Sequence, residues 1–290
     1  MRSRPIIAFL LTALLTILLV LPTGPVHRGR IEAAPPTVAF TWLTERVDAP
    51  KVFRKMSDHS LAIDTAGHVH LAYGADFLYY ATYDGSSWQV ETVDDSGYVG
   101  QYAALTLDAA GRPHISYYDV GKGSLKYAYF DGRWWHIFEI DSGLGRIGGY
   151  TSLALTASGQ PRISYYDGTN AALKYAIGDG STWITETVDT DLGFYPYDYD
   201  YGRTSLALDG ADRPHIAYYD DTNTSIKYAH HDGTVWQIQS IDTAGPHGNP
   251  PSLVVDSSNR PHIGYGDGFD VKHAWYNGVT WQNEVVVYEC

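Results

Sequence analysis

Tyrosine and aspartate alternate in one stretch of this 290-residue chain. The side chains there that could bind a ligand are Tyr195, Tyr197, Asp198, Tyr199, Asp200 and Tyr201. A tyrosine ring can stack on the C–H face of a sugar while a nearby carboxylate accepts hydrogen bonds from its hydroxyls. Tyrosine-rich loops also recognise proteins. We therefore expect this stretch to bind a glycan or an extracellular protein; an insertion that only folds back on the scaffold is the alternative.

The same carboxylates suit Ca²⁺, which takes about six to eight oxygen ligands. However, the chain has no Asp-x-Asp-x-Asp-Gly loop of the EF-hand type. We expect no cofactor, and Ca²⁺ stays the one ion to test.

Histidine recurs at one position of a repeated sequence, at His70, His114, His215 and His262, and Arg162 replaces it in the third copy. One imidazole per copy suggests a ring of metal ligands, but the strand that carries them should lie away from the centre of the fold, too far apart to share an ion. We favour a histidine hydrogen-bonded within its own unit, because arginine keeps the donors without binding metal. Lysine and aspartate beside the next hairpin are likewise interpreted as local ion pairs: Lys126 with Asp119, Lys174 with Asp167, and Lys227 with Asp220.

These residues belong to a motif that recurs five times. The second copy contains Pro113-His-Ile-Ser-Tyr-Tyr-Asp119, then Leu125-Lys-Tyr-Ala128 and Asp131-Gly-Arg-Trp-Trp135. The tryptophans that end the motif are 45 to 53 residues apart, at Trp88, Trp135, Trp183, Trp236 and Trp281. A period in the forties is typical of one four-stranded propeller blade.

Each copy contains four short β-type runs, and none of the stretches between them has helical periodicity. In the second copy we expect strands over 103–108, 113–118, 124–129 and 135–140, separated by turns rich in Gly and Asp. The predicted fold is all-β, a β-propeller of five four-stranded blades. Its repeats cover about 57–102, 103–150, 151–203, 204–250 and 251–290.

An additional strand is expected before the first repeat, over residues 37–48, because Trp42 precedes Trp88 by nearly one period. Such an N-terminal strand would pair with the last blade and close the ring, which removes an open sheet edge. The closure leaves the blade count open to a sixth partial blade or to two chains that share strands.

The first 34 residues differ from the rest of the chain. A basic start is followed by an apolar run from Ile6 to Val20, shorter than the roughly 20 residues that span a bilayer. This pattern is typical of an export signal. We predict a signal peptide or N-terminal anchor over residues 1–34, a propeller over 35–290, and a secreted or cell-surface protein.

Charge and cysteine content exclude several classes of partner. The formal net charge of −13 at pH 7 repels phosphate backbones, so we expect no nucleic-acid partner. The single cysteine, Cys290, cannot form an internal disulfide, and stability must come from packing between blades. We expect a monomer.

The repeated turns Asp84-Gly-Ser-Ser-Trp88 and Asp179-Gly-Ser-Thr-Trp183 resemble the Asp boxes of secreted bacterial β-propellers, the group that includes sialidase-type propellers. The resemblance covers residues 57–290 and implies the fold. Five-bladed lectin propellers of the tachylectin type are similar in repeat length and in using one sugar site per blade. A sialidase would also bring a Phe/Tyr-Arg-Ile-Pro motif, and the nearest sequence here is Phe53-Arg-Lys-Met56. The recurring arginines Arg112, Arg213 and Arg260 lie one per blade and should not converge on one carboxylate.

The sequence thus favours a secreted, non-catalytic propeller that binds carbohydrate or protein through an acidic, tyrosine-rich rim. That rim consists of the second hairpins and the connections between blades, where the copies differ most. An extracellular glycoside hydrolase of sialidase-like fold is the alternative, and a structural cell-surface module is a third.

Overall fold

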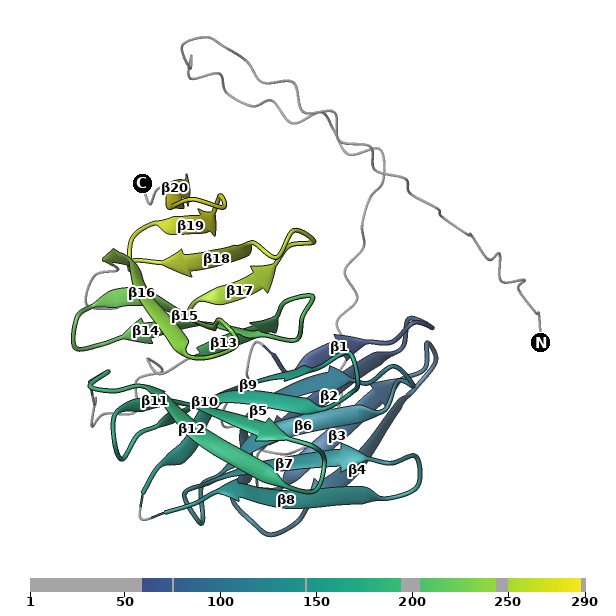
Figure 1. Ribbon diagram of the computed structural model, residues 1–290. Coiled ribbons are helices and arrows are strands. Elements are labelled where there is room, and N and C mark those ends of the chain that lie inside the picture. The colour runs from purple at the N-terminus through teal and green to yellow at the C-terminus, as the bar shows by residue number, and fades with distance from the viewer. Residues whose placement is uncertain (1–58, 75, 144, 194–203, 244–249, 288–290) are drawn as a thin grey trace, which may run out of the picture. The chain divides into compact units, whose positions relative to one another are not determined.

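The computed structural model describes residues 59–74, 76–143, 145–193, 204–243 and 250–287. The chain divides into two compact units, Met1–Glu45 and Arg46–Cys290, and all described residues lie in the second. They form 20 strands and no helix. The strands make five antiparallel sheets of four, each ordered as in the chain (Figure 1). We call these sheets blades 1 to 5 in chain order.

The strand bounds repeat from blade to blade. Blade 1 contains β1 (Leu61–Ile63), β2 (Val69–Gly74), β3 (Leu78–Tyr83) and β4 (Trp88–Asp94). Blade 2 contains β5 (Val99–Leu107), β6 (Pro113–Asp119), β7 (Ser124–Phe130) and β8 (Trp135–Asp141). Blade 3 contains β9 (Ile147–Leu155), β10 (Pro161–Asp167), β11 (Ala172–Gly178) and β12 (Trp183–Asp189). Blade 4 contains β13 (Thr204–Leu208), β14 (Pro214–Asp220), β15 (Ser225–His231) and β16 (Trp236–Thr243), and blade 5 contains β17 (Ser252–Val255), β18 (Pro261–Gly266), β19 (Val271–Tyr276) and β20 (Trp281–Val287).

Local sequence explains these bounds. Proline begins the second strand of blades 2 to 5, where the ladder does not need its missing N–H. In the turn before each fourth strand an aspartate or asparagine accepts backbone N–H groups two and three residues ahead, as Asp131 does from Arg133 and Trp134, both at 2.7 Å. In blade 2, the bounds of β6, β7 and β8 lie within one residue of the predicted bounds. β5 begins four residues early, because bulged pairs such as Gln101 with Tyr118 extend it.

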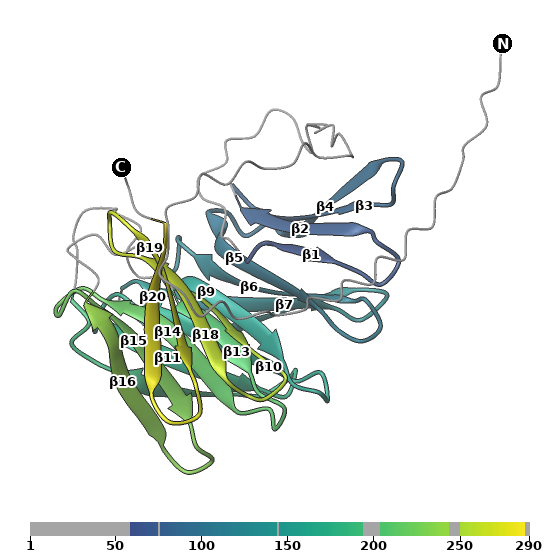
Figure 2. The same ribbon diagram turned by 90° about the horizontal axis from the view of Figure 1, so that it is seen from above.

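The core lies between consecutive blades, which pack face to face (Figures 1 and 2). Between blades 2 and 3, Leu125 and Tyr127 pack with Ile147 and Ile163. The tryptophan that begins the fourth strand of blades 2 to 5 meets a tyrosine of the preceding blade edge-on, a favourable aromatic geometry. These pairs are Tyr80–Trp135, Tyr127–Trp183, Tyr175–Trp236 and Tyr228–Trp281, with ring centroids 4.9 to 5.4 Å apart.

Hydroxyl groups join neighbouring blades along their first two strands. Ser116 Oγ donates to Thr151 Oγ1 at 2.8 Å, and Ser164 and Thr204 make the equivalent contact at 2.6 Å. All four residues are buried. These bonds satisfy polar groups that would otherwise be costly to bury.

An aspartate at or near the end of the fourth strand of blades 1 to 4 binds a tyrosine and a lysine of the next blade. Asp94 accepts from Tyr117 Oη at 2.6 Å and pairs with Lys126. We call this three-residue contact the inter-blade lock, and its other copies are Asp141 with Tyr165 and Lys174, Asp189 with Tyr218 and Lys227, and Asp242 with Tyr265 and Lys272.

The ion pairs expected within each blade are present in two blades, but they are longer than the ion pairs of the inter-blade lock. Lys126 lies 3.7 Å from Asp119 and Lys227 lies 3.2 Å from Asp220, but the closer carboxylate comes from the preceding blade in both cases. The sequence did not indicate this closer partner, because that aspartate precedes its lysine by more than 30 residues.

The described residues confirm the all-β prediction with the five sheets of a five-bladed β-propeller. The predicted closing strand over residues 37–48 lies outside the described residues, and so do residues 1–34 and Cys290. Within the described part of the chain, no helix is long and apolar enough to cross a membrane.

The locks differ in burial, and this difference predicts unequal effects on stability. Asp94 and Lys126 are 5% and 8% exposed, whereas Asp242 and Lys272 are 25% and 18% exposed. Asp94→Ala leaves a buried ammonium with a distant partner and should cost about 3 kcal/mol. Asp242→Ala should cost about 1 kcal/mol, because Lys272 keeps Asp267 as a partner at 2.8 Å and is more exposed than Lys126. Urea unfolding followed by circular dichroism compares the two, and equal losses would contradict the lock as a main source of stability.

Candidate binding site between blades 2 and 3

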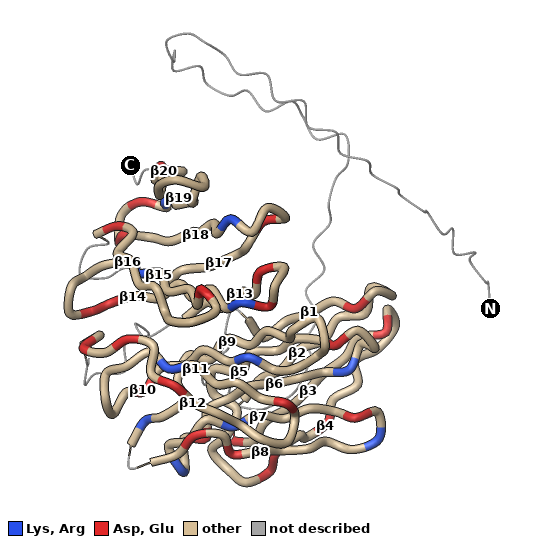
Figure 3. The backbone as a smooth tube through the Cα atoms, in the orientation of Figure 1, with Lys and Arg blue, Asp and Glu red and all other residues tan. Residues whose placement is uncertain are grey.

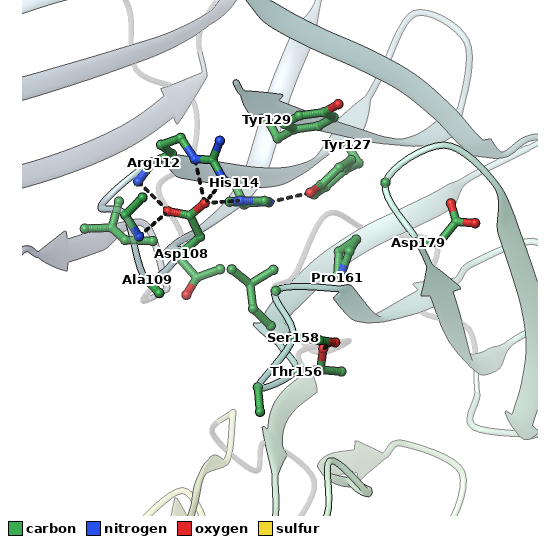
Figure 4. Close-up of a pocket in the computed structure, with 17 residues that line it drawn as sticks. Asp108, Ala109, Arg112, His114, Tyr127, Tyr129, Thr156, Ser158, Pro161 and Asp179 are labelled. Atoms are coloured by element: carbon green, nitrogen blue, oxygen red, sulfur yellow. Dashed lines mark hydrogen bonds and ion pairs between the residues drawn. The ribbon is translucent and has the colours of Figure 1, made fainter. Parts of the chain in front are cut away.

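A cavity of about 580 Å³ opens between blades 2 and 3 (Figure 4). This volume lies within the range of small-molecule sites in proteins. Blade 2 provides the β5–β6 turn and side chains of β6 and β7, while blade 3 provides the β9–β10 and β11–β12 turns. The residues discussed below are Asp108, Arg112, His114, Tyr129, Gly159 and Asp179.

Asp108 and Arg112 form one side of the cavity (Figure 4). Asp108 caps the β5–β6 turn by accepting the N–H groups of Ala110 and Arg112 at 2.9 and 2.8 Å, and it binds Arg112 Nε at 2.7 Å and Nη2 at 2.6 Å. Burial alone would raise the pKa of Asp108, but the hydrogen bonds from Arg112 outweigh it and lower the pKa. Arg112 Nη1 also donates to the Asp131 carbonyl oxygen at 3.3 Å, and the side chain, 47% exposed, keeps its remaining N–H groups for a ligand.

His114 and Tyr127 form the base of the cavity. His114 Nδ1 and Tyr127 Oη lie 2.5 Å apart, and His114 Nε2 lies 3.8 Å from Asp108. Burial lowers the pKa of His114, so this imidazole is neutral at pH 7. Blades 1 and 4 contain the same pairing, His70 with Tyr80 and His215 with Tyr228. The prediction of a histidine bonded within its own blade is confirmed.

Tyr129 lines the cavity, with a histidine ring stacked on each of its two faces. Its ring lies near-parallel to those of His114 and His136, at 17° to each, with centroids 5.7 and 4.9 Å away. The three residues are cross-strand neighbours on β6, β7 and β8, which fixes the orientation of the ring. No hydrogen bond of the Tyr129 hydroxyl occurs within the described residues, so this group can serve a ligand.

The opposite wall carries Asp179, whose carboxylate is also engaged. It accepts the N–H groups of Ser181 and Thr182 at 2.8 and 2.7 Å and the Thr182 hydroxyl at 2.6 Å. These bonds, the one from the Thr182 hydroxyl first, lower the pKa of Asp179. Both carboxyl groups of the cavity are therefore ionised at neutral pH. Glycoside hydrolysis needs a carboxylic acid that keeps its proton, so the cavity suits binding better than hydrolysis.

The residues that the sequence singled out for ligand binding, Tyr195, Tyr197, Asp198, Tyr199, Asp200 and Tyr201, lie outside the described residues. On the described part of that rim, aspartates cap their own hairpins. Asp167 binds Thr169 and Asn170, and Asp220 binds Asn223. Figure 3 shows acidic residues recurring in such turns. Much of the acidic character predicted for binding is thus used by the scaffold.

Sequence reasoning missed the cavity. Arg112 and His114 were noted but interpreted as constant repeat positions, and Tyr129 was not singled out. The sequence does contain a feature that could have indicated the cavity. The residue at the Tyr129 position differs in every blade, and the other blades have Thr82, Ile177, His230 and Trp275 there. The arginines do remain apart, because each pairs with the aspartate four residues before it.

No three His, Cys, Asp or Glu side chains come together as a metal-binding group in the described ranges. The four recurring histidines each stay within their own blade, as the bonds of His70, His114, His215 and His262 show.

No protein-family model and no curated protein matches this chain. Solved structures are similar in fold. An ulvan lyase, bound to a GlcA–Rha3S unit, is 14% identical with a TM-score of 0.58, over 80% of this chain and 72% of the lyase. A mutant of the Aleuria aurantia lectin in complex with Fucα1-6GlcNAc is 13% identical with a TM-score of 0.54, over 82% of this chain and 81% of the lectin. Such low identity supports the propeller fold alone.

The lowered pKa of His114 predicts how stability depends on pH. As the pH falls through about 6.5, the unfolded chain takes up a proton more readily than the folded one, so the free energy of unfolding decreases. His114→Gln should be less stable than wild type at pH 7 but should lose less further stability between pH 7 and 5. Urea titrations across this range measure both slopes.

His215→Gln is the matched variant, because burial also lowers the pKa of His215 in blade 4. It should flatten the slope similarly. An unchanged slope in both variants would contradict the neutral, buried state assigned to these histidines.

Proposed function

We propose that this protein is a carbohydrate-binding β-propeller that binds a sugar in the cavity between blades 2 and 3. The observation that carries the proposal is the combination of Tyr129 and Arg112 at one opening. A sugar has a rim of hydroxyls, which can accept hydrogen bonds from the remaining N–H groups of Arg112. The Tyr129 hydroxyl adds a group that can donate or accept.

Rigidity of the side chains supports binding without rearrangement. Asp108 holds Arg112 through two nitrogens, and the cross-strand rings of His114 and His136 flank Tyr129. Groups that are already oriented lose less conformational entropy when a ligand arrives.

The sugars bound by structural neighbours agree with this proposal. The Aleuria aurantia lectin complex contains a fucosyl disaccharide, and the lyase complex contains a uronic acid and a sulfated rhamnose. Because the shared feature is the fold, these neighbours suggest which glycans to test first and do not assign one.

Bond cleavage is the second candidate, since a neutral imidazole beside a tyrosine hydroxyl can transfer protons. Against it, the same His–Tyr pair recurs in blades 1 and 4, and Tyr127 is fully buried. A pair repeated at three places is better explained by the scaffold than by one active site.

A glycan array probed with the purified protein, with and without Ca²⁺, tests the proposal. Wild type should retain fucosylated or uronic-acid glycans without releasing product. Arg112→Ala should reduce retention at least about tenfold, because it removes donors from the cavity. Arg213→Ala is the matched control: Arg213 makes the same bonds to Asp209 in blade 4 and should leave retention unchanged.

Equal losses in the two arginine variants would place the effect in folding rather than in the cavity. Release of a shortened or unsaturated product from the array glycans would favour an enzyme. Retention of no glycan by wild type would overturn the proposal.

The tyrosine-rich stretch remains a proposed second contact surface, for glycan or for an extracellular protein. Tyr197→Ala, Tyr199→Ala and Tyr201→Ala combined should weaken binding of a retained ligand. Unchanged binding would remove this stretch from the site.

We also propose export through residues 1–34. The basic start and the apolar run support it. Expression in a secreting host and N-terminal sequencing of the exported product checks this: a start near residue 35 indicates a cleaved signal, an intact Met1 on membranes indicates an anchor, and retention in the cytoplasm contradicts export.

A further inference from the structure

Each blade has a turn between its first and second strands, and these turns line the clefts between blades. The fourth residue of each turn has a positive φ, a conformation open to glycine, asparagine and aspartate. The residues, in chain order, are Gly67, Gly111, Gly159, Asp212 and Asn259, with φ from 59° to 87°.

Where this residue has a side chain, it makes a hydrogen bond across the cleft in front of it. Asp212 Oδ1 accepts the Ala157 N–H of blade 3 at 2.9 Å, and Asn259 Oδ1 accepts the Gly210 N–H of blade 4 at 2.9 Å. We call this bond the turn clasp. It joins the first-hairpin turns of blades 3 and 4 and of blades 4 and 5.

Between blades 2 and 3 the clasp cannot form, because glycine stands at residue 159. The amide equivalent to those of Ala157 and Gly210 belongs to Ala109, which lines the cavity together with Gly159. A Cβ added to Gly159 would meet no atom within 4 Å, so packing does not demand glycine there. The glycine leaves both the space and the Ala109 N–H open.

The residue type at the Tyr129 position varies independently of the turn residue that makes the clasp. The Tyr129 position is occupied by Thr82 beside the cleft of blades 1 and 2 and by Ile177 beside that of blades 3 and 4. His230 provides a ring beside the cleft of blades 4 and 5, but the Asn259 clasp spans that cleft. Among the four described clefts, only that between blades 2 and 3 combines glycine in its turn with an aromatic ring at this position.

We infer that the left-handed residue of this turn determines whether an inter-blade cleft is open to a sugar: glycine leaves the cleft open, and aspartate or asparagine closes it. The ligand part of this inference rests on the proposed function. Gly159 is thus a residue that sets the location of binding without contacting the ligand through a side chain.

Gly159→Asn tests the inference, because asparagine tolerates the required φ and can make the clasp to Ala109. Amide hydrogen exchange, followed by NMR without ligand, should show Ala109 exchanging roughly five- to tenfold more slowly, as one modest hydrogen bond predicts. Asp212→Gly should make Ala157 exchange faster by a similar factor. Unchanged exchange at both amides would overturn the inference.

Binding is then measured on the same glycan array. Gly159→Asn should reduce retention at least about tenfold with no loss of thermal stability, whereas Gly67→Asn, the same substitution in blade 1, should leave retention unchanged. A protected Ala109 amide with full retention would overturn the inference while the proposed function stands. No retention by wild type would instead overturn the proposed function and the ligand part of the inference, and the exchange data would still decide the clasp.

Discussion

The inter-blade lock is the interaction on which the rest of the structure depends. An isolated four-stranded sheet cannot bury both faces, so its stability comes from its neighbours. The lock fixes how two neighbours meet, because the carboxylate of Asp94 must reach both the Tyr117 hydroxyl and the Lys126 ammonium. The pairing costs desolvation of two charges, which is offset only when the geometry and additional hydrogen bonds are good. The tyrosine provides that additional bond. The lock thus adds a directional contact to the apolar packing between blades.

The lock has a direction, and this makes the two ends of the described array different. Each blade from 1 to 4 gives an aspartate to the blade that follows. β20 ends at Val287 where other fourth strands carry aspartate, and blade 1 has Tyr79 at the lysine position. Blade 5 also exposes apolar side chains, with Val254 at 61% and Val271 at 52%. The contact that ends the array must therefore use a different chemistry from the four internal ones.

The sequence predicted what is local and missed what is long-range. Tryptophan spacing, Pro113 and the Asp-Gly turns located the strands of blade 2, because hairpin chemistry acts over a few residues. The sequence indicated Asp119, which lies 3.7 Å from Lys126, but missed the closer Asp94, which precedes the lysine by 32 residues. The cavity was missed for the same reason: Ala109 and Gly159 belong to separate turns that only the packing of blades brings together. The sequence shows aspartate at residue 212 where blades 1 to 3 have glycine. The role of this aspartate became clear only from the packing of blades 3 and 4.

A repeat protein can change its function only at positions that its scaffold does not need. The carboxylates of Asp108 and Asp179 hold turns, and the histidines hold tyrosines, so altering them would weaken the blades. The left-handed turn residue is under a weaker constraint, because φ restricts it to a few residue types and the space in front of it is empty at Gly159. Within those few types, one choice makes a hydrogen bond across the cleft and the other leaves a cavity. A single residue per blade can therefore convert a structural contact into a ligand-accessible cleft without disturbing the lock that holds the blades together.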